Sequence, residues 1–277
     1  MNDEQNADSV SDQRILISFY GDDYTGTAAT AEALSQSGLP AVIFTEPPSP
    51  SYLERHFPGV RAVGISGTAR TLPAQDLPQV LAPIFLSLKA YQSPVYIYKV
   101  CSTFDSSENV GSIGRAIELG VEIFSPDFIP ILPAAPKLGR YTVFGNHFAA
   151  VGDREIFRLD RHPSMANHPV TPMGEADLRQ HLAQQTNLNS GLINILEIAE
   201  GPQRINSRID DHLDADAALI FFDCLSDEDL NVVCETVFKK TRDTKSLFFV
   251  GSQELGYGLT AALKKTGVLS KDTGIDT

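Results

Sequence analysis

The stretch that decides the fold is residues 15–45, which read ILISFYGDDYTGTAATAEALSQSGLPAVIFT. Its apolar ends, 15–21 and 41–45, are typical of buried strands. The residues between them favour a helix that Asp23 or Thr25 can cap and that Gly38 ends. About a dozen helical residues are enough for a crossover between parallel strands, so the stretch predicts a β-α-β unit.

The same alternation continues along the chain. Further strands are expected at 61–66, 95–100, 128–135, 191–198, 217–223 and 246–251, with helices near 75–91, 111–120, 174–186, 226–240 and 254–265. Strands that are apolar throughout and alternate with helices indicate an α/β fold with a doubly wound, mostly parallel sheet. Residues 136–173 are richer in Gly, Pro, Asn and His, and we expect a small antiparallel insertion there.

Composition excludes several classes of function. The chain has 277 residues and a formal net charge of −13, which argues against a nucleic-acid partner, although local basic side chains can still bind an anionic substrate. The three cysteines, Cys101, Cys224 and Cys234, have no zinc-site spacing and favour a reducing compartment. No apolar run suits a membrane helix and the opening is no signal peptide, so we expect a cytoplasmic protein with a disordered tail at 1–14.

The residues that follow each strand are the candidates for chemistry, because parallel sheets bind ligands at the carboxyl ends of their strands. Arg70 or Arg140 would anchor a carboxylate, and Asp22 or Asp23 would bind sugar hydroxyls or accept a proton from one. Since neighbouring residues leave a strand in opposite directions, we expect one aspartate to face the cleft and the other to cap the helix. The alternative, in which both serve only as caps or turn residues, stays open.

Other motifs carry little weight. Residues 256–261 match GxGxxA, but too few residues follow for the rest of a dinucleotide site, and the chain contains no GxxxxGK[ST] phosphate loop. His162 and His168 are expected to be turn residues, so we predict no metal site. Ser102 lacks a GxSxG elbow, which argues against a serine hydrolase.

Several stretches together resemble one family, the four-carbon acid sugar kinases. They are GDDYTGTAATAEALSQSGLPAVIF, GTARTLP, YKVCSTFDSS, APKLGRYTVFGNHF, HPVTPMGEADLRQHL and VGSQEL, which follow in order from about residue 15 to about 262. The resemblance implies ATP-dependent phosphorylation of threonate, erythronate or a related acid, with the amino-terminal domain binding the substrate. It also implies that ATP and Mg²⁺ are held mainly by a nucleotide-binding second domain or partner chain; a homodimer stays open.

The resemblance also implies a set of site residues. The family's DD-x-TG turn corresponds to Asp22, Asp23, Thr25 and Gly26, and of these the two aspartates are the expected catalytic residues. The other expected substrate-binding residues are Arg70, Lys99, Ser102, Thr103, Arg140, Asn146 and His147. The domain is expected to span 15–265, with a tail at 266–277 about where the family's second domain would begin.

Two positions depart from the family pattern, which reads D-S-T-L-R-G where this chain has CSTFDS at 101–106. An aspartate is replaced by Cys101 and an arginine by Asp105, which leaves the identity of the acid open. These changes motivate a second hypothesis, a non-catalytic sugar-acid-binding or regulatory module. A hydrolase using both aspartates is disfavoured, because neighbouring carboxylates cannot easily flank one bond at the spacing of about 5 Å or more that glycosidases require.

Overall fold

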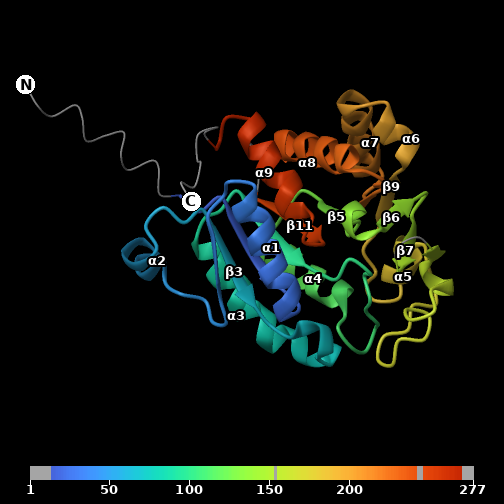
Figure 1. Cartoon of the computed structure of the whole chain (residues 1–277), viewed down its shortest axis with the longest axis horizontal. Helices are drawn as coiled ribbons and strands as arrows, with labels where there is room; N and C mark the ends of the chain where they lie inside the picture. The colour runs from blue at the N-terminus through green and yellow to red at the C-terminus, as the bar shows by residue number, and fades with distance from the viewer. Residues whose placement is uncertain (1–13, 153–154, 242–245, 270–277) are drawn as a thin grey trace, which may run out of the picture.

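A computed structural model describes residues 14–152, 155–241 and 246–269. Eight strands form one parallel sheet in the order β2-β3-β1-β4-β11-β5-β10-β9 (Figure 1). They are β1 (Ile17–Gly21), β2 (Ala41–Phe44), β3 (Ala62–Ser66), β4 (Val95–Lys99), β5 (Ile129–Leu132), β9 (Ser190–Ile193), β10 (Leu219–Phe222) and β11 (Leu247–Gly251).

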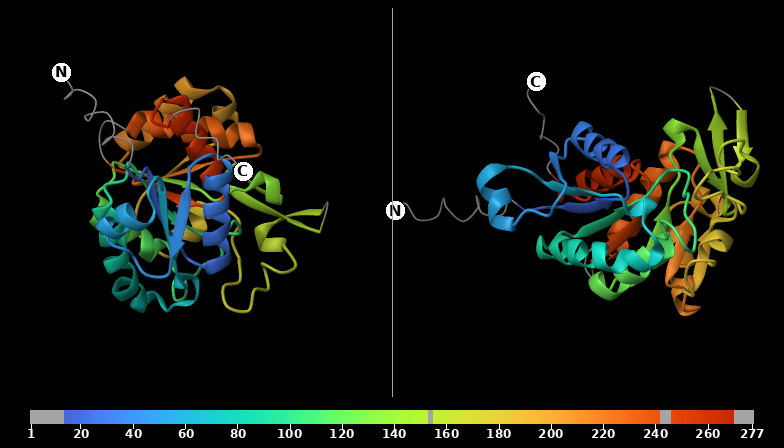
Figure 2. Two further views of the ribbon diagram at one scale, coloured as in Figure 1. Left: turned by 60° about the vertical axis from the view of Figure 1, so that its left-hand side comes forward. Right: turned by 90° about the horizontal axis from the view of Figure 1, so that it is seen from below.

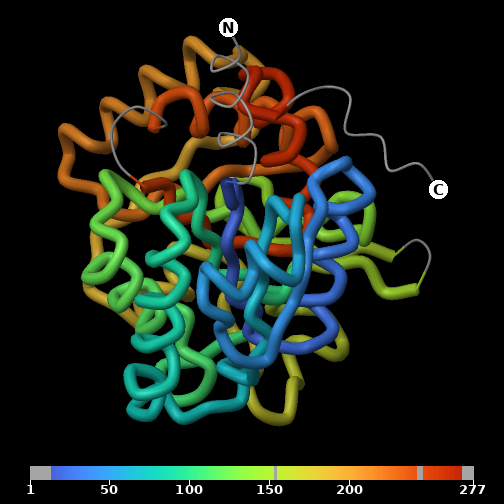
Figure 3. The backbone as a smooth tube through the Cα atoms, turned by 90° about the vertical axis from the view of Figure 1, so that its left-hand side faces the viewer, coloured from blue at the N-terminus to red at the C-terminus, as the bar shows by residue number. Residues whose placement is uncertain are grey.

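Helices cover both faces of the sheet (Figures 1 and 3). One face carries α1 (Tyr24–Gln36), α7 (Pro202–Asp214), α8 (Asp227–Thr241) and α9 (Leu255–Lys265), and the other carries α3 (Leu77–Ala90) and α4 (Ile113–Phe124). Shorter helices are α2 (Pro50–His56), α5 (Leu178–Leu182) and α6 (Ile195–Ala199), and the 3₁₀ turns are η2 (Ala69–Thr71), η3 (Ala74–Asp76), η4 (Pro136–Leu138) and η5 (Leu159–Arg161). The predicted doubly wound α/β fold is confirmed.

The core has two layers because successive strand residues face opposite sides of the sheet. In β1, Ile17 and Phe19 pack with α1 and α9, whereas Tyr20 packs with α3. The central strands are buried on both faces, which is why their sequences are almost entirely apolar, whereas the edge strand β2 is only partly buried.

The expected antiparallel insertion is also confirmed. Strands β6 (Arg140–Val143), β7 (Asn146–Val151) and β8 (Glu155–Arg158) form a three-stranded sheet in that order. Figure 2 shows this small sheet standing apart from the helical layers, and Figure 1 places it beside α5. It follows β5 and therefore belongs to the carboxyl edge of the large sheet.

Two predicted element boundaries were wrong. The strand expected at 191–198 stops at Ile193, because Asn194 and Glu197 form a capping box that starts α6. The helix expected at 174–186 is only α5, and α2 and α7 were not predicted at all. The tail expected at 266–277 stays a prediction, and Leu269 within it is buried in the core. The tail expected at 1–14 lies outside the described residues, except for Arg14.

Candidate functional site

Four charged side chains converge where β1, β3 and β4 end. Arg70 donates from Nε to Oδ2 of Asp22 at 3.1 Å and from Nη2 to Oδ1 of Asp22 at 2.8 Å, and the same Nη2 also contacts Asp23. Lys99 Nζ lies 2.8 Å from Oδ2 of Asp23 and 3.6 Å from Oδ1 of Asp22. We call Asp22, Asp23, Arg70 and Lys99 the charge cluster.

Backbone hydrogen bonds fix the three chain segments that carry the cluster. The N–H of Asp22 donates to the carbonyl of Lys99 at 3.1 Å, and the N–H of Arg70 donates to the carbonyl of Asp22 at 3.2 Å. The chain leaves β1 through α1 towards β2, and leaves the adjacent β4 through α4 towards β5. The cluster therefore lies at a topological switch point, the usual ligand position of such sheets.

Asp23 both caps α1 and belongs to the cluster. Its Oδ1 accepts the N–H of Gly26 at 2.6 Å, while Oδ2 faces Lys99. The expectation that one aspartate caps the helix while the other faces the cleft is therefore wrong in part. Asp23 is the cap, but both carboxylates contact Arg70 and Lys99. The reason is that Asp23 has extended backbone at the start of the helix, which brings its side chain back over the strand end.

Gly26 is required by the close approach of Lys99. A Cβ placed on Gly26 would lie 1.5 Å from Nζ of Lys99 and 2.8 Å from Oδ2 of Asp23. Because the glycine of the DD-x-TG turn has no side chain, the buried lysine has room to contact Asp23. Thr25, in contrast, is exposed on the first turn of α1.

The two carboxylates have opposite pKa shifts. Burial raises the pKa of Asp22 to about 6, although Arg70 and Lys99 oppose the change. Burial also acts on Asp23, but hydrogen bonds from Lys99 and Gly26 outweigh it and hold the pKa of that carboxyl below its ordinary value. Burial would lower the pKa of Arg70, but its hydrogen bonds to Asp22 and the nearby negative charges raise it.

The loop after β4 places the next candidates beside the cluster. Ser102, Thr103 and Asp105 are buried, and Thr103 Oγ1 donates to Oδ1 of Asp105 at 2.5 Å. The negative charge of Asp105 acts on Arg70, so the residue that departs from the family pattern lies within electrostatic reach of the cluster. The backbone carbonyl of Ser102 lies 2.7 Å from Nε2 of His147, which ties this loop to β7.

Two predicted residues lie outside these contacts. The guanidinium of Arg140 donates to backbone carbonyls of the insertion, including that of Leu138 at 2.7 Å. The side-chain amide of Asn146 donates to the carbonyl of Phe144 at 3.2 Å. In this structure both residues stabilise turns of the insertion and neither contacts the charge cluster.

Asp223 is a buried residue that the sequence reasoning missed. It follows β10 and accepts the N–H groups of Phe144 at 2.5 Å, Gly145 at 2.9 Å and Ile195 at 3.0 Å. Its carboxylate therefore fastens the β6–β7 turn to the large sheet. The sequence does contain a signal for Asp223. This aspartate ends the apolar run AALIFFD and therefore lies at another carboxyl end of the same sheet.

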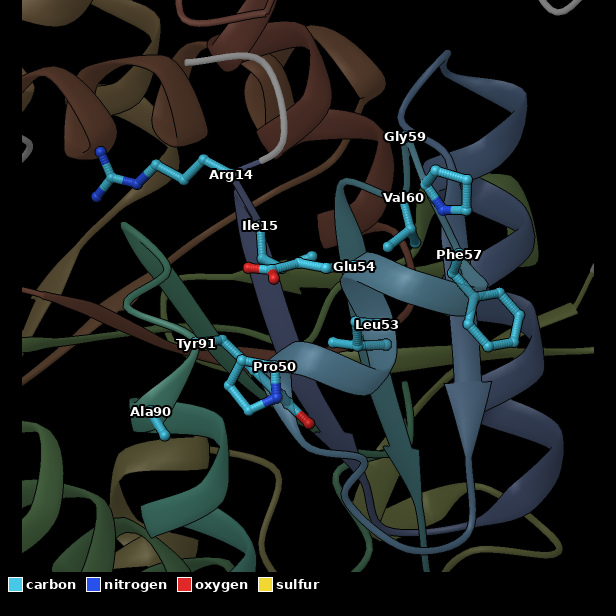
Figure 4. A pocket seen from close by; sticks show the side chains of 11 residues that line it. Arg14, Ile15, Pro50, Leu53, Glu54, Phe57, Gly59, Val60, Ala90 and Tyr91 are labelled. Carbon is cyan, nitrogen blue, oxygen red and sulfur yellow. The ribbon is translucent and has the colours of Figure 1, made fainter. Parts of the chain in front are cut away.

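The described residues form a groove and a cleft that are large enough for a small ligand. A groove of about 240 Å³ at the opposite, amino edge of the sheet is lined by Leu53, Phe57, Val60 and Tyr91, with Arg14 and Glu54 among its polar residues (Figure 4). A polar cleft of about 400 Å³ lies beside the loop after β4, and Ser106, Glu175, His181 and Gln184 are among the residues that line it.

The donor set does not fit a resident metal ion. Both cluster aspartates are already paired with cations, and the described residues include no group of three or more His, Cys, Asp or Glu side chains suited to a metal. Across 14–152, 155–241 and 246–269, no helix combines the length and apolar composition needed to cross a bilayer.

Fold and site together define a doubly wound α/β domain with a charge cluster at its ligand-binding edge. Residues 17–259 match the model of a family described as the sugar-binding N-terminal domain. The chain belongs to this family, which confirms its resemblance to the amino-terminal domain of the four-carbon acid sugar kinases.

The chain is similar to kinases of small sugar acids. It is 41% identical over 255 residues to the 3-oxo-isoapionate kinase of Paraburkholderia graminis and 29% identical over 258 residues to the 3-oxo-tetronate kinase of Methylobacterium radiotolerans. These matches cover 92% and 93% of this chain but 53% and 57% of the relatives. The chain thus spans about half the length of these relatives.

A solved structure has the same fold. A protein from Salmonella typhimurium LT2, titled a putative tRNA synthase, matches with a TM-score of 0.78 at 26% identity. The match covers 88% of this chain and 55% of that one.

Proposed function

We propose that this chain is the substrate-binding half of an ATP-dependent kinase that phosphorylates a hydroxyl of a small, four-carbon sugar acid. The observation that supports it most is the convergence of Asp22, Asp23, Arg70 and Lys99 from three strands at one switch point. The kinase names of the relatives supply the reaction class. ATP and Mg²⁺ then belong to a nucleotide-binding domain or partner chain, because the cluster does not fit a metal.

The cluster suits this role through its charges. Arg70 and Lys99 present donors for the carboxylate of the acid, and Asp23, whose side chain is 25% exposed, is positioned to accept a hydrogen bond from a sugar hydroxyl. Asp22, with a pKa raised to about 6, is the member of the pair matched to accept a proton near neutral pH. Phosphoryl transfer depends mainly on positioning and electrostatics, to which such a cluster of charged side chains can contribute.

Calorimetric titration with erythronate and threonate tests the proposal. We expect weak binding of at least one acid to the wild-type chain and a loss of about tenfold or more in Arg70→Lys, because lysine keeps the charge but not the paired N–H groups. Titration of succinate, which lacks hydroxyls, is the control. Equal affinity of the wild-type chain and Arg70→Lys for every acid would contradict the proposed role of Arg70.

The kinase step itself is tested by ³¹P NMR of erythronate and ATP with the chain. Little turnover is expected from the chain alone, and a phosphate ester should form when a nucleotide-binding half is added. Rapid phosphorylation by the chain alone would refute the division into two halves.

A second function, a non-catalytic sugar-acid-binding or regulatory module, is favoured by one observation. Asp105 stands at a position where the family pattern has an arginine, and it places an additional negative charge near Arg70. In this case the chain would bind a sugar acid but give no phosphate ester with any nucleotide-binding half. A homodimer is compatible with either function, and sedimentation would show it.

A further inference from the structure

The polar cleft beside the loop after β4 is built from buried, hydrogen-bonded side chains. Ser106 and His181 are 1% and 5% exposed, and Oγ of Ser106 lies 2.9 Å from Nε2 of His181. The amide nitrogen of Gln185 lies 2.9 Å from the same Oγ and 3.1 Å from the same Nε2. The volume of about 400 Å³ is typical of small-molecule pockets, which span about 300–1,000 Å³.

The side chain of Gln185 and the hydroxyl of Ser106 both contact Nε2 of His181. The carbonyl oxygen of the Gln185 side chain accepts the N–H of Gly114 at 3.2 Å, so its amide nitrogen faces Ser106 and His181. The hydroxyl of Ser106 also donates to the carbonyl of Phe104 at 3.1 Å. Protein groups therefore occupy Nε2 in either tautomer, and burial lowers the pKa of His181 to about 4, so the ring is neutral near pH 7.

The other ring nitrogen of His181, Nδ1, is the atom that the cleft offers to a ligand. No described residue makes a hydrogen bond to Nδ1, and His181 lines the cleft. The rest of the lining adds acceptors and amides, namely Glu108, Glu175 and Gln184. The described residues that line the cleft include no arginine or lysine, so the site disfavours a second carboxylate and suits hydroxyl groups, which both donate and accept.

The loop after β4 connects this cleft to the charge cluster. It leaves β4 at Lys99, a member of the cluster, and reaches Ser106, whose Oγ lies 2.9 Å from Nε2 of His181. Asp105 directly precedes Ser106, and its negative charge contributes to the raised pKa of Arg70. A sugar acid whose carboxylate is held at Arg70 and Lys99 would direct its hydroxyl-bearing end past Asp105 towards His181.

We propose that the cleft is the subsite that recognises the hydroxyl groups of the sugar acid, with Nδ1 of His181 as one contact and Gln184 as a second. These two residues then determine which acid is accepted. The inference deepens the proposed function and rests on it. It also gives a role to the last part of the insertion, since Pro172 lines the same cleft.

The test compares erythronate with 2,3-dihydroxybutanoate, which lacks the terminal hydroxyl, by calorimetric titration of the chain. The wild-type chain should prefer erythronate by about fivefold to tenfold, the effect of one hydrogen bond to a neutral group. His181→Gln should remove most of this preference, since its side-chain amide can still contact Ser106 and Gln185 but has no atom in the place of Nδ1. Gln184→Ala, at an exposed position that leaves the fold intact, should reduce the preference by a smaller factor.

Two controls separate the possible outcomes. Gln203→Ala, an exposed glutamine on α7, should keep the preference of the wild-type chain, and Arg70→Lys should weaken both acids equally. If the wild-type chain binds both acids equally, or both cleft variants retain the full preference, the subsite inference is wrong while the proposed function stands. If neither acid binds to the wild-type chain, the proposed function fails and the subsite inference fails with it.

Discussion

At the scale of single residues, the site is a set of charges that neutralise one another. Two carboxylates and two cations meet with Asp22 and Lys99 almost completely buried, at 3% and 2% exposure. An unpaired charge at such depth is strongly destabilising, so each member depends on its partners. The net charge of the cluster is zero when both carboxylates are ionised, which allows four charged groups to lie together at this depth.

Removal of Arg70 should expose this dependence. Arg70→Ala leaves Asp22 buried without its paired donors, and we expect a loss of about 3 kcal/mol or more in the free energy of unfolding. Arg115→Ala is the control, because its ion pair with Glu118 joins two partly exposed side chains and should contribute less than about 1 kcal/mol. Urea unfolding of both variants measures the difference, and equal losses would contradict this view of the cluster.

Gly26 allows a sharper test without removing a charge. In Gly26→Ala the added methyl group occupies the position of Nζ of Lys99, so the lysine must move away from Asp23. We expect lower thermal stability and at least tenfold weaker erythronate binding, about 1.4 kcal/mol, despite the better helix propensity of alanine. Ala28→Ser, at an exposed position of the same helix, is the control. Unchanged binding in Gly26→Ala would show that Lys99 does not contribute to the site.

The sequence allowed the cluster residues to be proposed but not their pairing. Asp22, Asp23, Arg70 and Lys99 all follow or end strands, and such positions share one edge of a parallel sheet. Which atoms pair depends on the strand order and on the cap geometry of Asp23, and neither is encoded locally. Asn146 and Arg140 were grouped with the cluster because they belong to the same motifs, but motif membership does not fix where a turn places a side chain.

At the scale of elements, the insertion is attached to the large sheet by buried polar side chains rather than by a wide apolar surface. Asp223 receives two N–H groups of the β6–β7 turn, and Phe144 and Gly145 there have positive φ angles of 50° and 78°. His147 adds the contact with Ser102. The apolar cluster of the insertion itself is small, with four buried residues.

Asp223→Asn should therefore loosen the insertion selectively. An asparagine offers one acceptor oxygen and turns an N–H₂ group towards backbone donors, so at least one hydrogen bond is lost, at a cost of about 1–3 kcal/mol. Hydrogen exchange should show faster exchange in residues 140–151 and little change in β1 and β4. Glu155→Gln, at an exposed position of the same insertion, is the control. An equal increase in exchange along the whole chain of Asp223→Asn would contradict the anchoring role.

Boundaries at this scale were the least predictable from the sequence. The residues after Ile193 continue the apolar pattern of a strand, but Asn194 and Glu197 form hydrogen bonds that begin a helix instead. Helix α7 was not predicted, because most of its residues are polar. Only a few of them, such as Ile205 and Ile209, are buried in the core.

At the scale of the whole molecule, buried histidines connect stability to pH. Burial lowers the pKa of both His147 and His181 to about 4, below the ordinary value near 6.5. Each neutral histidine therefore adds stability above pH 6.5 that is lost as the pH falls through 4. Asp22 acts in the opposite sense, because its pKa is raised to about 6. Its contribution to the free energy of unfolding is greatest at low pH and declines as the pH rises through 6.

The two histidines outweigh the single aspartate, so we expect a net loss of stability from pH 7 to pH 4. Each histidine contributes up to about 3 kcal/mol to this dependence. His147→Gln should reduce the slope of unfolding free energy against pH over this range, whereas the exposed His56→Gln should not. Urea unfolding at several pH values measures the slope, and parallel curves for all three proteins would contradict the assignment.

The layered fold was predictable because almost every strand and helix of the sheet has its own local pattern. The strand order was not, since β11 is the last strand in the chain but lies between β4 and β5. That placement buries Phe248 and Phe249 in opposite core layers, and only the packing of the complete chain decides it.

The central claim is that a small sugar acid binds at the charge cluster. A crystal structure of the chain soaked with erythronate tests it most directly. The account predicts the acid within hydrogen-bond distance of Asp23 and Arg70, with its hydroxyl end directed to His181. An erythronate bound only in the amino-edge groove of Figure 4, with the carboxyl edge empty, would contradict the account.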